Sequence, residues 1–285
     1  MARAQVDAAM AKIASVSRAP IEERFAAPAV MGVINVTPDS FSDGGTYFNV
    51  EPAVTSAWGM LEAGAAIVDV GGESTRPGSG GVSAEEELRR VEPVLADLAG
   101  APVSIDTSKV QVARRALELG AELVNDVTAL RAEPELAGVV ADAGCYLCLM
   151  HMRGEPRTMQ ENPVYDDVVS DVKRFLEERL AFAVEAGVDE QRVCLDPGIG
   201  FGKTPAHNFE LVRRLDELCA LGRPVLVGFS RKSSLAKLIG REQVATTAVS
   251  VGAAVAAYDR GATILRVHDV REHVEALAAA RAVRG

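Results

Sequence analysis

The sequence of 285 residues has no long hydrophobic run. A membrane-spanning helix needs about 20 predominantly apolar residues. The best candidate, residues 244–258, is too short and is interrupted by Thr, Ser and Gly. The first 28 residues are rich in Ala with scattered charges, and they lack the compact apolar core of a secretory signal. We therefore expect a cytoplasmic protein that does not associate with a membrane.

Basic residues are in the minority. The chain has 30 Lys and Arg against 40 Asp and Glu, which gives a formal net charge of −10 at pH 7. Nucleic-acid surfaces carry clustered positive charge, so we expect no nucleic-acid partner. A small anion is still a possible ligand, because a few Arg or Lys side chains at close range outweigh the distant net charge.

Cysteine is scarce as well, with four residues in the chain. The spacing Cys145-x-x-Cys148 is that of half a zinc site. The surrounding segment, however, has the composition of a buried strand, on which residues three apart point to opposite faces. We therefore expect free thiols in a reducing compartment rather than a metal site.

A recurrent pattern runs through the rest of the chain: an amphipathic helix, a glycine, and then a short apolar run. Glycine suits the left-handed position that ends a helix, and apolar runs buried on both faces are typical of parallel strands. Eight such units predict a single (β/α)8 TIM barrel over residues 29–285, preceded by an extension, residues 1–28, to which we assign no role. The alternative is a doubly wound open sheet, but no GxGxxG motif follows the first strand. The predicted strands are residues 30–36, 67–70, 103–105, 123–124, 146–149, 193–195, 225–227 and 264–267.

In a TIM barrel the active site lies at the carboxyl ends of the strands, so the polar residues there are candidates. Asp106, Asn125 and Asp196 follow three of the apolar runs. A carboxylate in such a place loses hydration unless it is paired. Three acceptors at one mouth favour a ligand rich in N–H donors, such as the guanidine-like edge of a heterocycle. For Asp106 alone, capping of the next helix is the competing interpretation.

The last two predicted strands lead to cationic residues, Lys232, Arg266 and His268. The phosphate site of TIM barrels usually lies in this region, so positive charge here predicts an anionic group. A solvated basic turn at a helix start is the alternative, but it would oppose the helix dipole. Asn35, at the end of the first strand, could ligate Mg²⁺ together with phosphate oxygens.

Two loops, residues 37–49 and 71–81, are rich in glycine. Such loops can close over a substrate, although ordinary surface turns share the composition. Phe41, in the middle of the first loop, favours the closing interpretation, because an exposed aromatic side chain needs something to cover.

The chain resembles the dihydropteroate synthase family of folate biosynthesis, the target of sulfonamides, over about residues 30–270. The first 28 residues lie outside this resemblance. The matching motifs fall in family order on the predicted strand ends. They are residues 31–45 (MGVINVTPDSFSDGG), 69–78 (DVGGESTRPG), 104–107 (SIDT), 125–127 (NDV), 149–152 (LMHM), 196–203 (DPGIGFGK), 228–232 (GFSRK) and 266–269 (RVHD).

The resemblance implies a homodimeric transferase that uses Mg²⁺. It joins 6-hydroxymethyl-7,8-dihydropterin diphosphate to 4-aminobenzoate and yields 7,8-dihydropteroate and pyrophosphate. It also implies that Asp106, Asn125 and Asp196 bind the pterin. Lys232 would donate to the pterin's oxygen and ring nitrogen, and Arg266 would stack on the ring.

The same resemblance implies that Asn35, Arg266 and His268 hold the diphosphate, with Asn35 also on Mg²⁺. Lys232, Arg266 and His268 are thus the expected catalytic residues. We expect pyrophosphate to leave before the amine attacks, because an electron-rich dihydropterin can stabilise a cation on its methylene. The residues expected around aminobenzoate are Phe41, Thr75, Pro77, Phe201 and Ser230, and Arg76 and Met150 complete the expected substrate-binding set.

Two other classes share parts of this pattern. A pterin-binding methyltransferase module would share the pterin-binding floor formed by Asp106, Asn125 and Asp196. It would not need the motif Ser230-Arg-Lys232 or a pyrophosphate site. A non-catalytic homologue would have lost loop residues or diphosphate ligands, and here they are present. The sequence therefore favours the synthase.

Overall fold

The computed structural model describes residues 19–37, 50–75, 79–155, 158–241 and 246–285. Eight parallel strands hydrogen-bond in sequence order and close into a barrel. This confirms the predicted TIM barrel, and each predicted strand overlaps an observed one. The strands are β1 (Ala29–Asn35), β2 (Ile67–Gly71), β3 (Val103–Asp106), β4 (Leu123–Asp126), β5 (Tyr146–Met150), β6 (Val193–Asp196), β7 (Val225–Val227) and β8 (Ala262–Val267).

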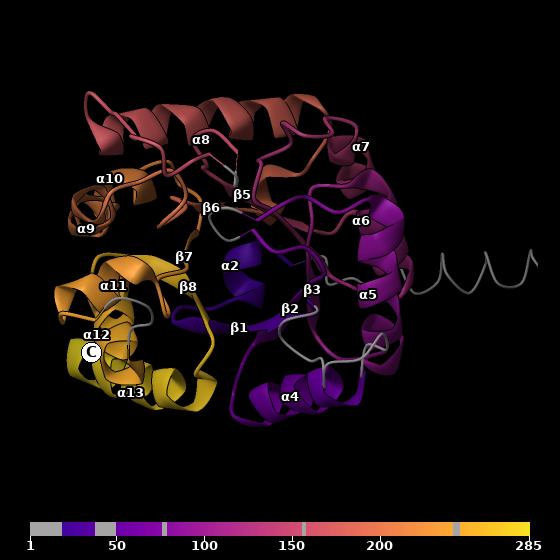
Figure 1. The fold of residues 1–285 in the computed structure, drawn as a ribbon, viewed down its shortest axis with the longest axis horizontal. Helices are drawn as coiled ribbons and strands as arrows, with labels where there is room; N and C mark the ends of the chain where they lie inside the picture. Colours follow the sequence, from indigo (N-terminus) through magenta and orange to yellow (C-terminus); the bar gives the residue numbers. More distant parts are fainter. Residues whose placement is uncertain (1–18, 38–49, 76–78, 156–157, 242–245) are drawn as a thin grey trace, which may run out of the picture.

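Helices surround the ring of strands (Figure 1). Ser83, Asp167 and Thr204 each begin a helix by accepting a backbone N–H with the side chain, the arrangement that satisfies a free donor at a helix start. No helix among the described residues has the length and apolar character needed to cross a membrane. The helices are α2 (Ile21–Arg24), α4 (Val50–Glu62), α5 (Ala84–Asp97), α6 (Val110–Glu118), α7 (Leu136–Ala143), α8 (Val168–Glu185), the 3₁₀ helix η1 (Glu190–Arg192), α9 (Pro205–Arg213), α10 (Leu215–Cys219), α11 (Ser233–Leu238), α12 (Thr247–Asp259) and α13 (Val270–Arg284).

The core has two layers, because alternate residues of a strand point to opposite faces of the sheet. Side chains that point inward, among them Met31, Tyr146 and Cys148, fill the barrel towards the amino-terminal ends of its strands. Side chains that point outward pack against the helices, and Cys145 belongs to this outer layer. Cys145 and Cys148 thus lie on opposite sides of the sheet, as the strand interpretation predicted.

The amino-terminal end of the barrel is closed by residues 19–28. Ile21 and Phe25 of this segment are fully buried against the inner layer. The ring of Phe25 meets that of Tyr146 edge to face at 5.6 Å, and the Tyr146 hydroxyl donates to the Ala19 carbonyl at 2.9 Å. Residues 19–28 of the extension therefore pack against the barrel, and residues 1–18 lie outside the described part of the chain.

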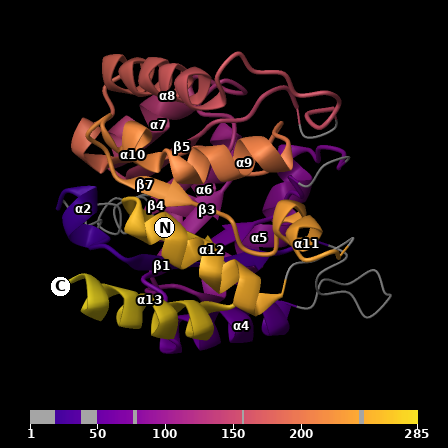
Figure 2. The ribbon, with the colours of Figure 1, turned by 90° about the vertical axis from the view of Figure 1, so that its left-hand side faces the viewer.

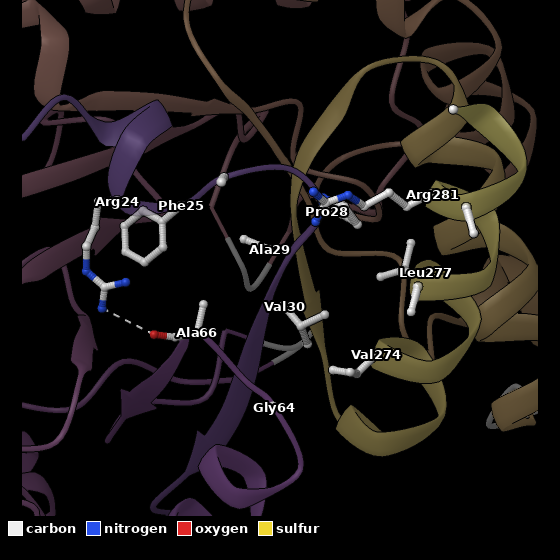
Figure 3. A pocket seen from close by; sticks show the side chains of 14 residues that line it. Arg24, Phe25, Pro28, Ala29, Val30, Gly64, Ala66, Val274, Leu277 and Arg281 are labelled. Atoms are coloured by element: carbon white, nitrogen blue, oxygen red, sulfur yellow. Dashed lines mark hydrogen bonds between the residues drawn. The ribbon is translucent and has the colours of Figure 1, made fainter.

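A cavity of about 590 Å³ lies at this closed end, between β1 and α13. Figure 3 shows Leu277 and Arg281 of α13 facing Pro28 and Val30 across it. Figure 2 places α2 at one end of the barrel and α11, which follows β7, at the other. The cavity is therefore remote from the carboxyl ends of the strands, where the candidate site lies.

Candidate active site

Four strands contribute to one ionic network at the carboxyl end of the barrel. Arg266 of β8 donates from Nε to Oδ2 of Asp69 on β2 at 2.7 Å, and from Nη2 to Oδ2 of Asp106 on β3 at 2.8 Å. Asn125 of β4 donates from Nδ2 to the same Asp69 oxygen at 2.9 Å. The barrel thus brings together two of the three predicted acceptors and one of the predicted cations.

Asp69 is the member of this network for which no role was predicted from the sequence. Its side chain is fully buried and accepts hydrogen bonds from both Arg266 and Asn125. The available signal was a charged residue inside an otherwise apolar strand, a position that requires a partner. Oδ1 of Asp69 and Oδ1 of Asn125 are buried acceptors without a donor among the described residues. These two oxygens can therefore accept hydrogen bonds from the N–H groups of a ligand.

Charge within the network is set by burial and by close neighbours. Burial and the nearby Asp69 raise the pKa of Asp106 to about 8, against the opposing effect of Arg266. Burial lowers the pKa of Arg266, but Asp69 and Asp106 outweigh it and hold that pKa above its ordinary value. Arg266 therefore stays charged, while burial and Asp69 hold the pKa of Asp106 above that of an ordinary carboxyl group.

Asp196, the third predicted acceptor, lies at the end of β6. Its Oδ1 accepts the backbone N–H of Gly198 at 2.7 Å. Burial raises the pKa of Asp196 to about 6, and the Gly198 N–H and the cations Lys232 and Arg266 limit the rise. At pH 7 the carboxyl group is therefore mostly ionised and accepts hydrogen bonds only.

Lys232, the predicted pterin donor, is half-buried beside these groups. Its Nζ lies 4.3 Å from the centroid of the Phe201 ring, a cation–π arrangement. Burial and Arg266 lower the pKa of Lys232 to about 8, whereas Asp196 and Asp106 raise it. Donors and acceptors thus lie side by side on the floor of the mouth, as a heterocycle with both kinds of group requires.

His268 and Ser230 lie together between the ends of β7 and β8. Oγ of Ser230 is 3.2 Å from Nδ1 of His268 and also accepts the His268 backbone N–H at 3.3 Å. Burial, with Arg231 and Arg266, lowers the pKa of His268 to about 4. The ring is therefore neutral at pH 7, which corrects the expectation that His268 supplies positive charge. It can still donate one hydrogen bond.

Asn35, the predicted metal ligand, ends β1 next to Gly71 of β2. Its side chain is half-buried, and no hydrogen bond joins it to another described residue. The described residues contain no cluster of three or more His, Cys, Asp or Glu that could hold a metal ion. A metal here would therefore depend on substrate oxygens, which is how Mg²⁺ is usually bound beside phosphates.

The remaining predicted residues lie around the mouth or outside the described part of the chain. Thr75 is half-buried in the loop after β2. Met150, at the end of β5, is opposite Asp196 in the strand register, and Phe201 packs against its cluster. Phe41, Arg76 and Pro77 lie outside the described residues.

Two buried residues next to the floor were also missed, Lys203 after β6 and His151 after β5. Nζ of Lys203 lies 2.8 Å from Nδ1 of His151. The sequence placed both in matching motifs, but only their mutual contact shows that they form a pair.

Comparison with known proteins identifies the same chemistry. A family model described as pterin binding enzyme matches residues 31–268. The dihydropteroate synthase of Escherichia coli strain K12 is 48% identical over 253 residues, covering 88% of this chain and 89% of that protein. The dihydropteroate synthase of Neisseria meningitidis serogroup C is 49% identical over 258 residues, covering 88% and 91%.

Solved structures agree with these relatives. Xanthomonas albilineans dihydropteroate synthase with 4-aminobenzoic acid has a TM-score of 0.85 and 49% identity, covering 92% of this chain and 94% of that one. The same enzyme in complex with 7,8-dihydropteroate has a TM-score of 0.82 and 47% identity, covering 92% and 95%. With the motifs on the strand ends and their side chains gathered in one network, the chain belongs to the pterin-binding enzymes and, among them, to the dihydropteroate synthases.

Proposed function

We propose that the barrel mouth binds 6-hydroxymethyl-7,8-dihydropterin diphosphate on its acidic floor and joins it to 4-aminobenzoate, releasing pyrophosphate. The observation that carries this proposal is the pairing of acceptors and donors on one floor. Asp196 and Asn125 offer oxygens, while Lys232 offers an N–H donor beside them. A pterin has N–H groups on its aminopyrimidine edge and acceptors at its oxygen and ring nitrogen, so it matches both.

Arg266 serves two parts of the substrate in this proposal. Asp69 and Asp106 hold its guanidinium, so the plane can stack on the pterin ring without losing its orientation. The same charge attracts the diphosphate. Because this group is fixed before the substrate arrives, it stabilises developing negative charge without reorganisation in the transition state.

The diphosphate would lie towards Asn35, Arg266 and His268. His268, neutral at pH 7, would donate one hydrogen bond rather than a charge. Asn35 has the oxygen that a hard cation prefers, so Mg²⁺ fits this place together with phosphate oxygens. When bound, Mg²⁺ would act as a Lewis acid that neutralises charge on the leaving pyrophosphate.

Bond breaking would precede bond making. Pyrophosphate leaves with the electron pair of the carbon–oxygen bond, and the dihydropterin ring stabilises the resulting methylene cation. The floor carboxylates, above all ionised Asp196, favour this cationic ring. The amine of 4-aminobenzoate then attacks the methylene carbon and loses a proton.

The second substrate would bind above the floor. Phe201 and Ser230 are placed at the mouth, on the loops after β6 and β7. Thr75 and Met150 border the same mouth, and the resemblance adds Phe41, Arg76 and Pro77 from the glycine-rich loops. A cytoplasmic homodimer is part of the same proposal, and light scattering of the purified protein tests the dimer.

A coupled pyrophosphate-release assay tests the function. With the pterin diphosphate and Mg²⁺, release should rise strongly when 4-aminobenzoate is added, and 7,8-dihydropteroate should form in equal amount. A protein that binds the pterin without releasing pyrophosphate would be a binding homologue. Transfer of a methyl group to a corrinoid protein would instead identify a methyltransferase module.

A further inference from the structure

The loop after β6, residues 197–203, shapes the floor of the mouth. Its residue Gly198 donates to Asp196, and its residue Phe201 faces the ammonium group of Lys232. Gly198, Gly200 and Gly202 all have positive φ, at +67°, +85° and +64°. Glycine loses more conformational freedom on folding than any other residue. A loop of this composition needs strong anchors to keep one shape.

Lys203 supplies such anchors from the end of the same loop. Its side chain is 2% exposed, and its Nζ reaches back to the loop's own backbone. Nζ donates to the carbonyls of Gly198 and Phe201, each at 3.0 Å. Gly198 contacts Asp196, and Phe201 contacts Lys232. The buried Nζ of Lys203 therefore anchors the loop at both Gly198 and Phe201.

His151 holds the same nitrogen from the neighbouring strand end. Its Nδ1 is 2.8 Å from Nζ of Lys203, and its carbonyl oxygen is 3.4 Å away. Edge-to-face packing against Phe175, with ring centroids 4.8 Å apart, fixes the imidazole. Burial and the charge of Lys203 lower the pKa of His151 to about 2, so the ring is neutral.

The contact extends to the backbone. A Cβ at Gly198 would lie 1.9 Å from the carbonyl oxygen of His151, so the loop rests directly on the end of β5. Burial lowers the pKa of Lys203 well below its ordinary value. Either protonation state keeps the arrangement, since both the ammonium and the amine have enough N–H groups for the two loop carbonyls.

We propose that Lys203, supported by His151, is a positioning residue that holds the β6 loop so that Gly198 and Phe201 keep the places that pterin binding requires. Lys203 touches neither substrate and acts through these two residues. Other side chains anchor other points: Asn208 accepts from the Gly200 N–H, and Tyr165 donates to the Gly202 carbonyl. The proposal rests on the proposed function.

The central experiment replaces Lys203 with Met, which keeps most of the volume and removes every donor. Calorimetry with the pterin diphosphate, without aminobenzoate, should show affinity lowered about ten- to a hundred-fold, as expected for buried polar groups left unpaired. The KM for aminobenzoate should also rise, because Phe201 is released. Unchanged pterin affinity in a folded Lys203→Met protein would overturn the proposal.

Arg179→Met is the matched control. Arg179 of α8 also donates to carbonyls of a strand-to-helix loop, those of Ala129 at 2.7 Å and Leu130 at 3.4 Å. Its loss should lower Tm but leave pterin affinity within about two-fold, because that loop carries no group proposed to touch the pterin. An equal loss of affinity in the control would mean that destabilisation, not positioning, explains the result.

His151→Phe keeps a ring against Phe175 and removes the acceptor, and it serves if Lys203→Met does not fold. It should lower pterin affinity by a smaller factor than Lys203→Met. The double variant should bind pterin no more weakly than Lys203→Met alone, since residues of one unit are not additive. Losses that multiply would contradict a shared role. If wild-type protein neither binds the pterin nor releases pyrophosphate, the proposed function fails instead, whereas an active wild type with unaltered variants overturns only this inference.

Discussion

Nε of Arg266 lies 2.7 Å from Oδ2 of Asp69, a carboxylate that is fully buried inside the barrel. The two residues are 197 positions apart in sequence and meet only because the barrel closes between β8 and β1. Closure of the barrel and orientation of the Arg266 guanidinium are therefore the same structural event.

Asp69→Asn should impair both stability and activity. The amide cannot neutralise Arg266, and breaking one side of a buried ion pair destabilises by about 3–5 kcal/mol. We expect a clear fall in Tm and a loss of kcat of at least about tenfold, since the guanidinium loses its fixed place. Thermal unfolding and the pyrophosphate assay measure the two effects. Glu92→Gln, which breaks an exposed ion pair with Arg115, should change neither. Wild-type kcat in a folded Asp69→Asn protein would show that Arg266 does not depend on Asp69.

Asp196→Asn should weaken pterin binding while keeping the shape of the floor. The amide turns an acceptor into a donor opposite a ligand N–H. A buried unpaired donor costs about 1–3 kcal/mol, or about ten- to a hundred-fold in affinity. Calorimetry with the pterin diphosphate measures the loss. A folded variant that binds as tightly as wild type would remove Asp196 from the site.

Pterin binding should also depend on pH through Asp196. Because its pKa is raised to about 6, mainly by burial, the carboxyl group takes up a proton as the pH falls through that value. The pterin then loses an ionised acceptor, so kcat/KM for the pterin diphosphate should have an acid limb near pH 6. The limb should disappear in Asp196→Asn. An unchanged limb in that variant would assign it to another group.

Protonation of Asp196, which should weaken pterin binding, should increase the free energy of unfolding. The pKa of Asp196 is about 6 in the folded protein and 3.8 in the reference state. The folded state therefore binds the proton more tightly, and this stabilisation is complete below about pH 4 and lost as the pH rises through 6. The size is about 3 kcal/mol. The unfolding free energy of wild type minus that of Asp196→Asn should therefore fall by most of this amount between pH 4 and pH 7. A difference that stays constant or rises over this range would contradict the prediction.

The timing of pyrophosphate departure can be tested by isotope exchange. If departure comes first, a labelled bridging oxygen of the pterin diphosphate should scramble with Mg²⁺ but without aminobenzoate. Arg266→Ala should reduce the exchange by about 10²–10³, the usual effect of losing a preorganised electrostatic contact. His268→Ala should reduce it less, because the ring is neutral at pH 7. No exchange in wild type would favour concerted displacement.

The strand ends could be predicted from sequence because burial on both faces leaves an apolar run that stops where the strand reaches the mouth. Asp106, Asn125 and Asp196 stand at such stops. Asn125 and Asp196 are buried, and the side chain of Asp106 is 10% exposed. The barrel itself follows from repeating this pattern eight times.

Other properties depend on distances that the sequence does not contain. Asp69 lies within its strand, and its partner comes from the far end of the chain. The neutral state of His268 results from burial and from Arg231 and Arg266 nearby. Lys203 follows a glycine and precedes a helix, so it reads as a surface residue until its side chain is seen to fold back under the loop.

The cavity at the closed end of the barrel is lined both by residues 24–26 and by Gly285. The described chain thus enters and leaves the fold at neighbouring points, on the face remote from the floor groups. A protein domain fused after Gly285 would extend away from the path that substrates take. The enzyme therefore offers an attachment point for tethering to a surface or to a second enzyme with its mouth left open.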